Sequence, residues 1–258
     1  MKASAFLVTC EHGGKRIPAP YLDCFAGQGA ALHSHRGFDP GALAMARDMA
    51  RRLGAPLYFS TISRLLVDLN RSPGHPRLHA ESIRRLPAAS RRRILERHYL
   101  PFRGKVEAAI RAALASGKRV IHVSSHSFTP VLGGVVRTAE VGLLYDPARD
   151  GEAALCRDWL ACLKALAPEL RVRRNYPYRG KSDGFTAHLR RCFPGEDYIG
   201  IELEINQRIA LAGGGPWRRL RRVLVDCLLQ AIGRSADGCR TADRQDARPI
   251  PHSGSLAD

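Results

Sequence analysis

The sequence predicts an α/β domain built on a mostly parallel or mixed central sheet with helices on both faces. Apolar segments of strand length alternate along the chain with amphipathic helical segments, a pattern typical of sheets covered by crossover helices. The chain has 258 residues and a hydrophobic fraction of 45%, enough to bury the core of one such domain. Unusual polar residues follow several of the strands, at the edge where such sheets form their sites.

Strands are expected where short apolar runs, rich in β-branched residues, stand between turn residues. The expected strands are residues 5–10, 56–62, 119–124, 141–145, 171–175 and 198–206. The run at 171–175 is short and carries several charges, so it is predicted to form an edge strand.

Helices are expected over residues 39–53, 88–100, 102–115, 152–166 and 216–234. Asp39 is a possible N-cap of the first of these, followed by Pro40 at the first helical position. Pro101 is expected to break the long helical pattern into two pieces. From Ser235 the chain is polar and has no periodicity, so we expect one domain over residues 1–234 and a disordered tail over 235–258.

The charge is strongly basic, with 41 Lys and Arg residues against 24 Asp and Glu residues and a net charge of +17. Such an excess can indicate nucleic-acid binding. The 35 arginines are spread along the chain, and their denser groups alternate with apolar residues on predicted helices. That distribution favours solvated helix faces over a nucleic-acid site. A non-catalytic protein that binds polyanions is the alternative from another functional class.

The seven cysteines form no CxxC pair and several lie in apolar helical patterns, which favours buried thiols in a reducing cytoplasm. The apolar run near the N-terminus is too short for a secretion signal, and no segment has the apolar length of a membrane span. We therefore expect a cytoplasmic protein without a membrane partner. The sequence leaves its oligomeric state open.

Residues with useful chemistry collect at the carboxyl ends of the predicted strands. The first strand runs into Glu11 and His12, and the third runs into His126. The last strand carries Glu202 and Glu204, which share one face because side chains alternate along a strand. Buried carboxylates are unfavourable unless they are paired, hydrogen-bonded or bound to metal. Together with imidazoles they indicate a metal site, and His with carboxylate suits zinc.

Each residue also has a purely structural interpretation. His12 fits a turn before two glycines, and His126 fits a core histidine bonded to neighbouring serines. Glu204 could pair with one of the arginines, and Asp68 could stabilise the turn at Asn70 through an Asx-type bond. All of these interpretations would have to hold at the same edge of one sheet, which favours a functional site.

Six segments, in this order and spacing, resemble the N-formylglutamate amidohydrolase family. They are CEHGG, FDPGALAMARDMA, LLVDLNRSP, HVSSHSF, NYPYRGKSDGFT and IELEINQ, and the resemblance covers roughly residues 5–232. The family is similar in fold to zinc carboxypeptidases and aspartoacylase-like deacylases, so the resemblance implies a phosphorylase/hydrolase-like α/β fold. Its named member cleaves N-formyl-L-glutamate to formate and glutamate in histidine degradation.

The resemblance implies one zinc ion per chain, with His12 and His126 as ligands. The carboxypeptidase pattern has a Glu three residues after the first His, where this chain has Lys15. The remaining ligand must therefore be Asp39 or Glu11. Asp39 is preferred because FDPG matches an acidic position of the family, and because an extended backbone would point Glu11 away from its neighbour.

The resemblance also implies roles in substrate binding and catalysis. Asn70 and Arg71 match a pair that holds a substrate carboxylate, which suits the two parallel bonds of a guanidinium. Glu204 is the candidate general base, and Glu202 is placed to support a ligand. Further candidates for substrate contact are Tyr178 and Arg179, in a Pro- and Gly-rich loop, and Arg137.

The sequence therefore predicts a zinc-dependent amidohydrolase that cleaves the linear amide of a small N-acyl amino acid, with N-formyl-L-glutamate preferred. A metallopeptidase or deacylase of the same fold, acting on another N-acyl or peptide substrate, is the alternative within this class.

Overall fold

A six-stranded sheet forms the centre of the molecule, which we describe from a computed structural model over residues 2–245. The strand order is β2-β1-β3-β8-β6-β7. Neighbouring strands run parallel except β8 and β6, which are antiparallel, so the sheet is mixed and mostly parallel as predicted. The strands are β1 (Ser4–Cys10), β2 (Leu57–Phe59), β3 (Arg119–Phe128), β6 (Val141–Leu144), β7 (Val172–Arg174) and β8 (Tyr198–Asn206). A separate hairpin joins β4 (Val131–Leu132) and β5 (Val135–Val136).

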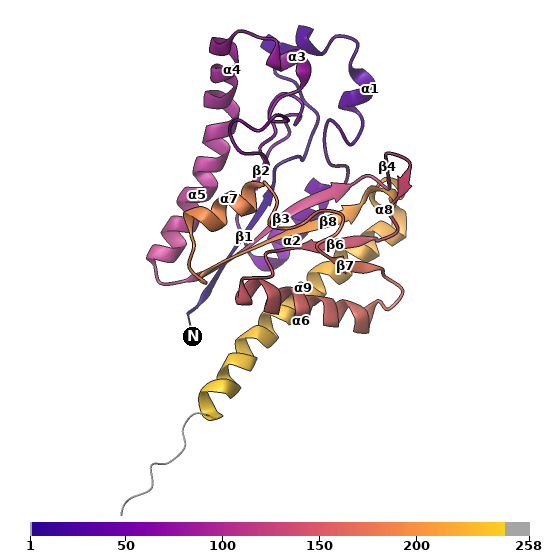
Figure 1. Cartoon of the computed structure of the whole chain (residues 1–258). Helices are drawn as coiled ribbons and strands as arrows, with labels where there is room; N and C mark the ends of the chain where they lie inside the picture. Colours follow the sequence, from indigo (N-terminus) through magenta and orange to yellow (C-terminus); the bar gives the residue numbers. More distant parts are fainter. Residues whose placement is uncertain (1, 246–258) are drawn as a thin grey trace, which may run out of the picture.

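Helices cover both faces of the sheet, which confirms the predicted fold class (Figure 1). One face carries α2 (Ala42–Leu53), α6 (Asp150–Leu166) and α9 (Gly214–Gln245). The other carries α5 (Leu100–Ala115) and α7 (Phe185–Cys192). Helix α7 was not expected from the sequence, and neither was the short α8 (Gln207–Ala212) that follows β8.

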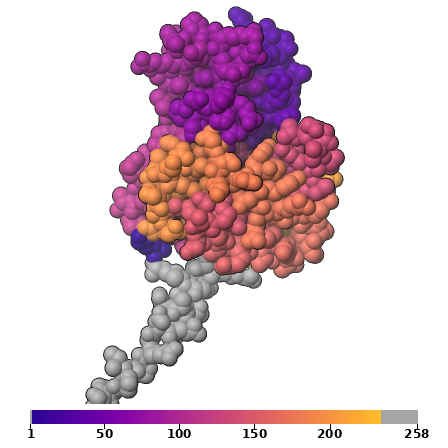
Figure 2. All heavy atoms as spheres, in the orientation of Figure 1, coloured from indigo at the N-terminus to yellow at the C-terminus, as the bar shows by residue number. Residues whose placement is uncertain are grey.

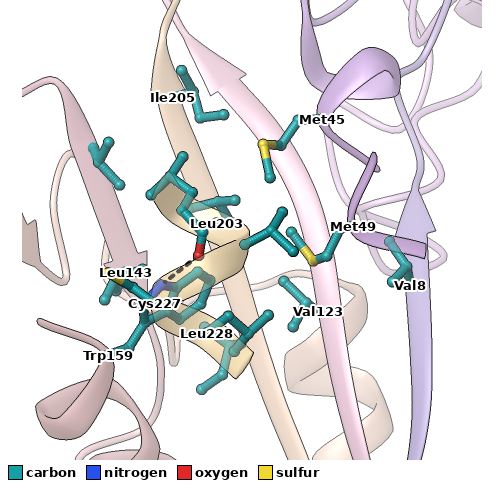
Figure 3. Close-up of a cluster of buried hydrophobic side chains, with 14 of the residues drawn as sticks. Val8, Met45, Met49, Val123, Leu143, Trp159, Leu203, Ile205, Cys227 and Leu228 are labelled. Carbon is teal, nitrogen blue, oxygen red and sulfur yellow. Dashed lines mark hydrogen bonds between the residues drawn. The ribbon is translucent and has the colours of Figure 1, made fainter. Parts of the chain in front are cut away.

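The larger hydrophobic cluster lies between the sheet and α2, α6 and α9 (Figure 3). Leu203 and Ile205 of β8 point into it, and Met45 and Met49 of α2 meet them from the helix side. Trp159 of α6 is fully buried and donates a hydrogen bond from Nε1 to the Leu224 carbonyl of α9 over 3.0 Å. The indole nitrogen is thereby satisfied, so this large side chain can be buried without loss of a hydrogen bond.

A smaller cluster fills the opposite face, where apolar residues of β1, β3 and β8 meet α5 and α7. His122 of β3 is buried here between the Thr9 hydroxyl and the Tyr198 hydroxyl, each 2.9 Å away. Burial lowers the pKa of His122 to about 4. This histidine is therefore neutral and serves the core.

A lobe of short helices stands beyond the carboxyl ends of the strands, at the top of Figure 1. It has its own apolar cluster, with Ile83 and Ile94 fully buried. Its helices are η1 (Ala19–Tyr21), η2 (Asp23–Phe25), α1 (Gly29–Leu32), α3 (Glu81–Arg84), α4 (Ala88–Ile94) and the π-helical turn η3 (Leu95–Tyr99). The expected break near Pro101 takes the form of this π-helical turn, after which α5 begins at Leu100.

Two predicted boundaries were wrong. Helix α2 begins at Ala42 with Gly41 as its N-cap, so Asp39 does not cap it. Helix α9 continues to Gln245, so the first part of the segment predicted to be disordered is helical, while residues 246–258 lie outside the described part. Within residues 2–245, no helix has both the length and the apolar character needed to cross a membrane.

Truncation of Leu203 to Ala is expected to lower the free energy of unfolding by about 2–5 kcal/mol, because a fully buried side chain leaves a cavity in the core. Urea denaturation at equilibrium measures the change. The matched control is Leu211→Ala on α8, where the side chain is 68% exposed and a change of about 0.5 kcal/mol or less is expected. Equal effects of the two substitutions would contradict this placement of the core.

Candidate active site

The parallel pairing of β1 and β3 brings two distant histidines together. His12 follows the carboxyl end of β1, and His126 lies near the carboxyl end of β3. Their ring centroids are 5.0 Å apart, and both side chains are buried. The two imidazoles are therefore close enough to contact one common ion.

Asp39 lies between the two imidazoles. Its Oδ2 is 3.3 Å from His12 Nδ1 and 3.0 Å from His126 Nδ1. Its backbone N–H donates to the His12 carbonyl over 2.9 Å, which fixes the segment before α2 against the end of β1. Gly41 then takes a φ of 84°, a left-handed conformation that suits glycine, and the helix begins. The aspartate that might have been a helix cap is thus directed into the site.

The outer nitrogens of the two rings also face carboxylates. His12 Nε2 lies 2.7 Å from Asp68 Oδ1, and His126 Nε2 lies 3.2 Å from Glu11 Oε2. The five groups therefore alternate in the order Asp68, His12, Asp39, His126, Glu11. A carboxylate on the second nitrogen fixes the orientation of an imidazole, as is common around metal-bound histidines.

Arg64 is a member of the site that the sequence analysis did not identify. It donates to Asp68 Oδ2 from Nη2 over 2.6 Å and from Nε over 3.1 Å. Its Nη1 lies 3.4 Å from Asp39 Oδ1, so one guanidinium contacts two of the buried carboxylates. The signal in the sequence was its position four residues before Asp68, within SRLLVD.

The surrounding charges keep these carboxylates ionised. Burial opposes ionisation of Asp39 and Asp68, yet the charges of His12 and Arg64 hold the pKa of each well below its usual range. Burial likewise opposes ionisation of Glu11, but hydrogen bonding and the charge of His126 lower its pKa to about 2. Although burial opposes it, Asp39 and Glu11 raise the pKa of His126 well above its usual value.

These residues fit a divalent cation. His12, Asp39 and His126 each offer a ligand atom, and the three atoms lie within 4.8 Å of one another. Two nitrogens and one oxygen form a donor set that zinc accepts. Among the described residues, Glu11 Oε1 is buried without a hydrogen-bond partner, so the site holds negative charge that the protein does not satisfy. Glu11 contacts only the outer nitrogen of His126, whereas Asp39 contacts both rings.

The carboxylates of β8 stand beside this cluster, because His126 is the register partner of Glu204. Glu202 accepts a hydrogen bond from the Thr186 hydroxyl of α7 over 2.5 Å. Glu204 Oε2 is buried and has no hydrogen-bond partner within residues 2–245. Burial raises the pKa of Glu204 to about 8, and the charges of Asp39 and Glu202 act in the same direction. Glu204 is thus a carboxyl group held ready to exchange a proton near neutral pH.

A cavity of about 1000 Å³ opens above these residues, between the lobe and the strand ends. Figure 2 shows this boundary, where the indigo and purple lobe meets the magenta and orange body. His12, Asp39, His126, Glu202 and Glu204 line its floor.

The substrate-binding candidates have different surroundings. Asn70 lines the cavity, but its Oδ1 accepts a hydrogen bond from the Phe185 amide over 2.5 Å. Arg71 lines the cavity and donates to the Asp183 carbonyl over 2.7 Å. Its contacts leave part of the guanidinium facing the cavity.

Tyr178 and Arg179 line the mouth of the cavity, as expected for a loop at this edge. Arg137 does not line it: its guanidinium donates to the Tyr178 hydroxyl over 3.2 Å and stacks on that ring. In this structure Arg137 therefore supports Tyr178 from behind.

A second group of possible metal ligands lies on the outer surface of α5 and α7, away from the cavity. It consists of Glu107, His188 and Cys192, of which Cys192 is exposed. Any metal analysis of the protein has to distinguish this group from the buried one.

The fold and the site together define a hydrolase: a mixed α/β sheet whose carboxyl edge presents imidazoles and carboxylates to a large cavity. The model of the N-formylglutamate amidohydrolase family matches residues 4–211 of the chain. The chain therefore belongs to that family, which confirms the resemblance seen in the sequence, and it is a hydrolase that acts on linear amide bonds.

Solved structures share the fold. A gene product of Agrobacterium tumefaciens is 29% identical, with a TM-score of 0.78 over 91% of this chain and 93% of that one. An N-formylglutamate amidohydrolase from Ralstonia eutropha is 20% identical, with a TM-score of 0.66 over 94% and 96% of the two chains. A putative carboxypeptidase A from Shewanella denitrificans is 15% identical, with a TM-score of 0.38 over 90% and 56%. No curated protein matches the chain.

Substitution of Arg64 by Gln is expected to lower the free energy of unfolding by about 3 kcal/mol, because it leaves Asp39 and Asp68 buried without their cation. The matched control is Arg92→Gln, whose partner Glu96 is also four residues away but exposed, so that about 1 kcal/mol or less is expected. Urea denaturation of both variants measures the difference. A loss no greater than that of the control would show that Arg64 does not compensate the buried charges.

Proposed function

We propose that this hydrolase is zinc-dependent and cleaves the amide of a small N-acyl amino acid, with N-formyl-L-glutamate as the substrate. The observation that carries the proposal is the sharing of Asp39 by two buried imidazoles on the floor of the cavity. The family supports the reaction class, and the name of the Ralstonia eutropha protein supports the substrate.

His12, Asp39 and His126 would hold the ion. When bound, zinc acidifies a water molecule and polarises a carbonyl, and so supplies the nucleophile for amide hydrolysis. Asp68 and Glu11 would keep the two imidazoles in the orientation that ligation needs. The positive charge of the ion also favours the carboxylate form of Glu204.

Glu204 acts as the general base in this proposal. Its carboxylate takes a proton from the attacking water and passes it to the leaving amine when the C–N bond breaks. Its uncommitted Oε2 suits this role, because a base must be free to accept a proton. Glu202 is bonded to Thr186 and instead helps to set the position of the strand face.

Arg71 would bind the carboxylate of the amino acid part. The guanidinium lines the cavity and is fixed at one nitrogen by the Asp183 carbonyl. A fixed guanidinium binds a carboxylate with less loss of side-chain entropy than a mobile one. Tyr178 and Arg179, at the mouth, would contact the rest of the substrate.

Metal analysis of the purified protein is expected to give about one zinc per chain, and chelation is expected to abolish amide hydrolysis. His126→Ala should lose the metal, because it removes one of three ligands. Cys192→Ser should retain the metal, because its sulfur belongs to the outer group. Loss of zinc from the Cys192 variant with retention in the His126 variant would place the ion elsewhere.

Glu204→Gln is expected to keep the zinc while turnover of N-formyl-L-glutamate falls by about 10²–10⁴-fold, the usual contribution of a catalytic acid–base group. Formate release measures turnover, and metal analysis verifies that the site is intact. Glu140→Gln, a change at a half-buried surface glutamate outside the cavity, serves as the control. Turnover within a few-fold of the parent enzyme would exclude Glu204 as the base.

A further inference from the structure

The cavity is larger than an N-acyl amino acid requires. Its volume of about 1000 Å³ is at the upper end of the range, about 300–1000 Å³, that is typical of pockets for drug-sized ligands. An N-formyl amino acid is much smaller than such a ligand. The additional space lies toward the lobe, where Gln28, Pro76 and Ser82 line the walls.

Charge is segregated along this cavity. Four carboxylates line the floor, those of Asp39, Asp68, Glu202 and Glu204. Exposed arginines line the mouth, namely Arg36, Arg77, Arg84 and Arg179. An ion bound at the floor would neutralise the inner charge, so that an entering ligand meets a positive opening.

The four arginines of the mouth are not engaged by the protein. Within residues 2–245, none of their guanidinium groups forms an ion pair or a side-chain hydrogen bond. Arg64, deeper in the same cavity, is by contrast paired with two carboxylates. Unpaired arginines are common in a chain with this excess of basic residues, but these four surround one opening.

The four come from separate segments of the chain. Arg36 precedes the segment that carries Asp39, Arg77 and Arg84 belong to the lobe, and Arg179 belongs to the loop after β7. They therefore stand on different walls of the cavity, at a distance from the groups assigned to the chemistry. A ligand that reached several of them would have to extend out of the floor.

We propose that the substrate extends beyond one amino acid and carries further carboxylates, as in a short N-formylated peptide of acidic residues, and that these arginines bind them. The inference rests on the proposed function for the scissile bond. Arginine suits this role because its guanidinium matches carboxylate geometry and attracts anions over distances up to the Debye length.

Three substrates test the proposal: N-formyl-glutamate, N-formyl-triglutamate, and N-formyl-glutamyl-dialanine, which has the length but not the additional charges. We expect kcat/KM for the triglutamate to exceed that of the other two by about tenfold, as several exposed charge pairs would provide. The preference should shrink at an ionic strength of about 1 M, where the Debye length is only about 3 Å. Equal kcat/KM values for all three would overturn the proposal and leave the proposed function intact.

The double variant Arg77→Gln/Arg84→Gln should reduce the preference for the triglutamate to less than about threefold. The matched control is Arg92→Gln/Arg93→Gln on α4, which removes two exposed arginines outside the cavity. An unchanged preference in the first variant, or an equal loss in both, would exclude a specific role for these arginines.

A binding measurement keeps this test independent of catalysis. Calorimetric titration of the protein with tri-D-glutamate and tri-D-alanine, which offer no N-formyl group, should show binding of the acidic peptide alone. Binding that is lost in the Arg77/Arg84 variant supports the anion site even if N-formyl-glutamate is not hydrolysed, an outcome that would refute the proposed function. No binding of the acidic peptide would overturn the inference.

Discussion

The interaction on which the rest of the site depends is the sharing of Asp39 by His12 and His126. Buried carboxylates and imidazoles are stable only when they satisfy one another, and here they alternate, with Asp68 and Glu11 as the outer members. The arrangement requires the ends of β1 and β3 to lie side by side, which parallel pairing provides. It also requires a close approach at the turn after His12: a Cβ on Gly14 would stand 2.6 Å from the Thr61 carbonyl, so a larger residue would push this segment away. Local backbone geometry and sheet topology thus act together to build one cluster.

Strand β8 links this cluster to the stability of the fold. Its odd-numbered residues, such as Leu203 and Ile205, fill the larger core, while its even-numbered residues Glu202 and Glu204 face the site. A slip of one residue in the pairing with β3 would bury both carboxylates in the apolar core and expose the apolar residues to the cavity. The register is therefore strongly determined by burial, and the same energy that stabilises the sheet places the candidate base beside His126. Groups held by a rigid strand in this way are positioned more accurately than groups on a loop.

Patterns of short range predicted the elements that carry the site, and long-range contacts decided the rest. Alternation along residues 198–206 predicted correctly that two glutamates share a face, because a strand has only two faces. The choice between helix cap and site residue for Asp39 depended on where His126 lies, and no local pattern contains that information. Arg64 escaped notice for the same reason: one arginine among 35 becomes significant only when two carboxylates are placed against it. Arg137, expected near substrate, instead lies behind Tyr178, an outcome decided by the packing of two loops.

The lobe determines how this chemistry can be reached, and its attachment explains why it does not move independently of the site. The π-helical turn before α5 carries Tyr99, whose hydroxyl donates to the Arg71 carbonyl over 2.7 Å. Arg103, one turn further on, donates to the same carbonyl over 3.1 Å and lies over the Tyr99 ring. A π-helical turn shifts the side chains that follow it relative to a regular α-helix, and such turns are frequent at functional sites. Here it directs a buried hydroxyl and a guanidinium at one backbone carbonyl. The helix that packs on the sheet therefore fixes the residue assigned to carboxylate binding, and the lobe that forms the cavity wall is joined to the catalytic edge through that residue.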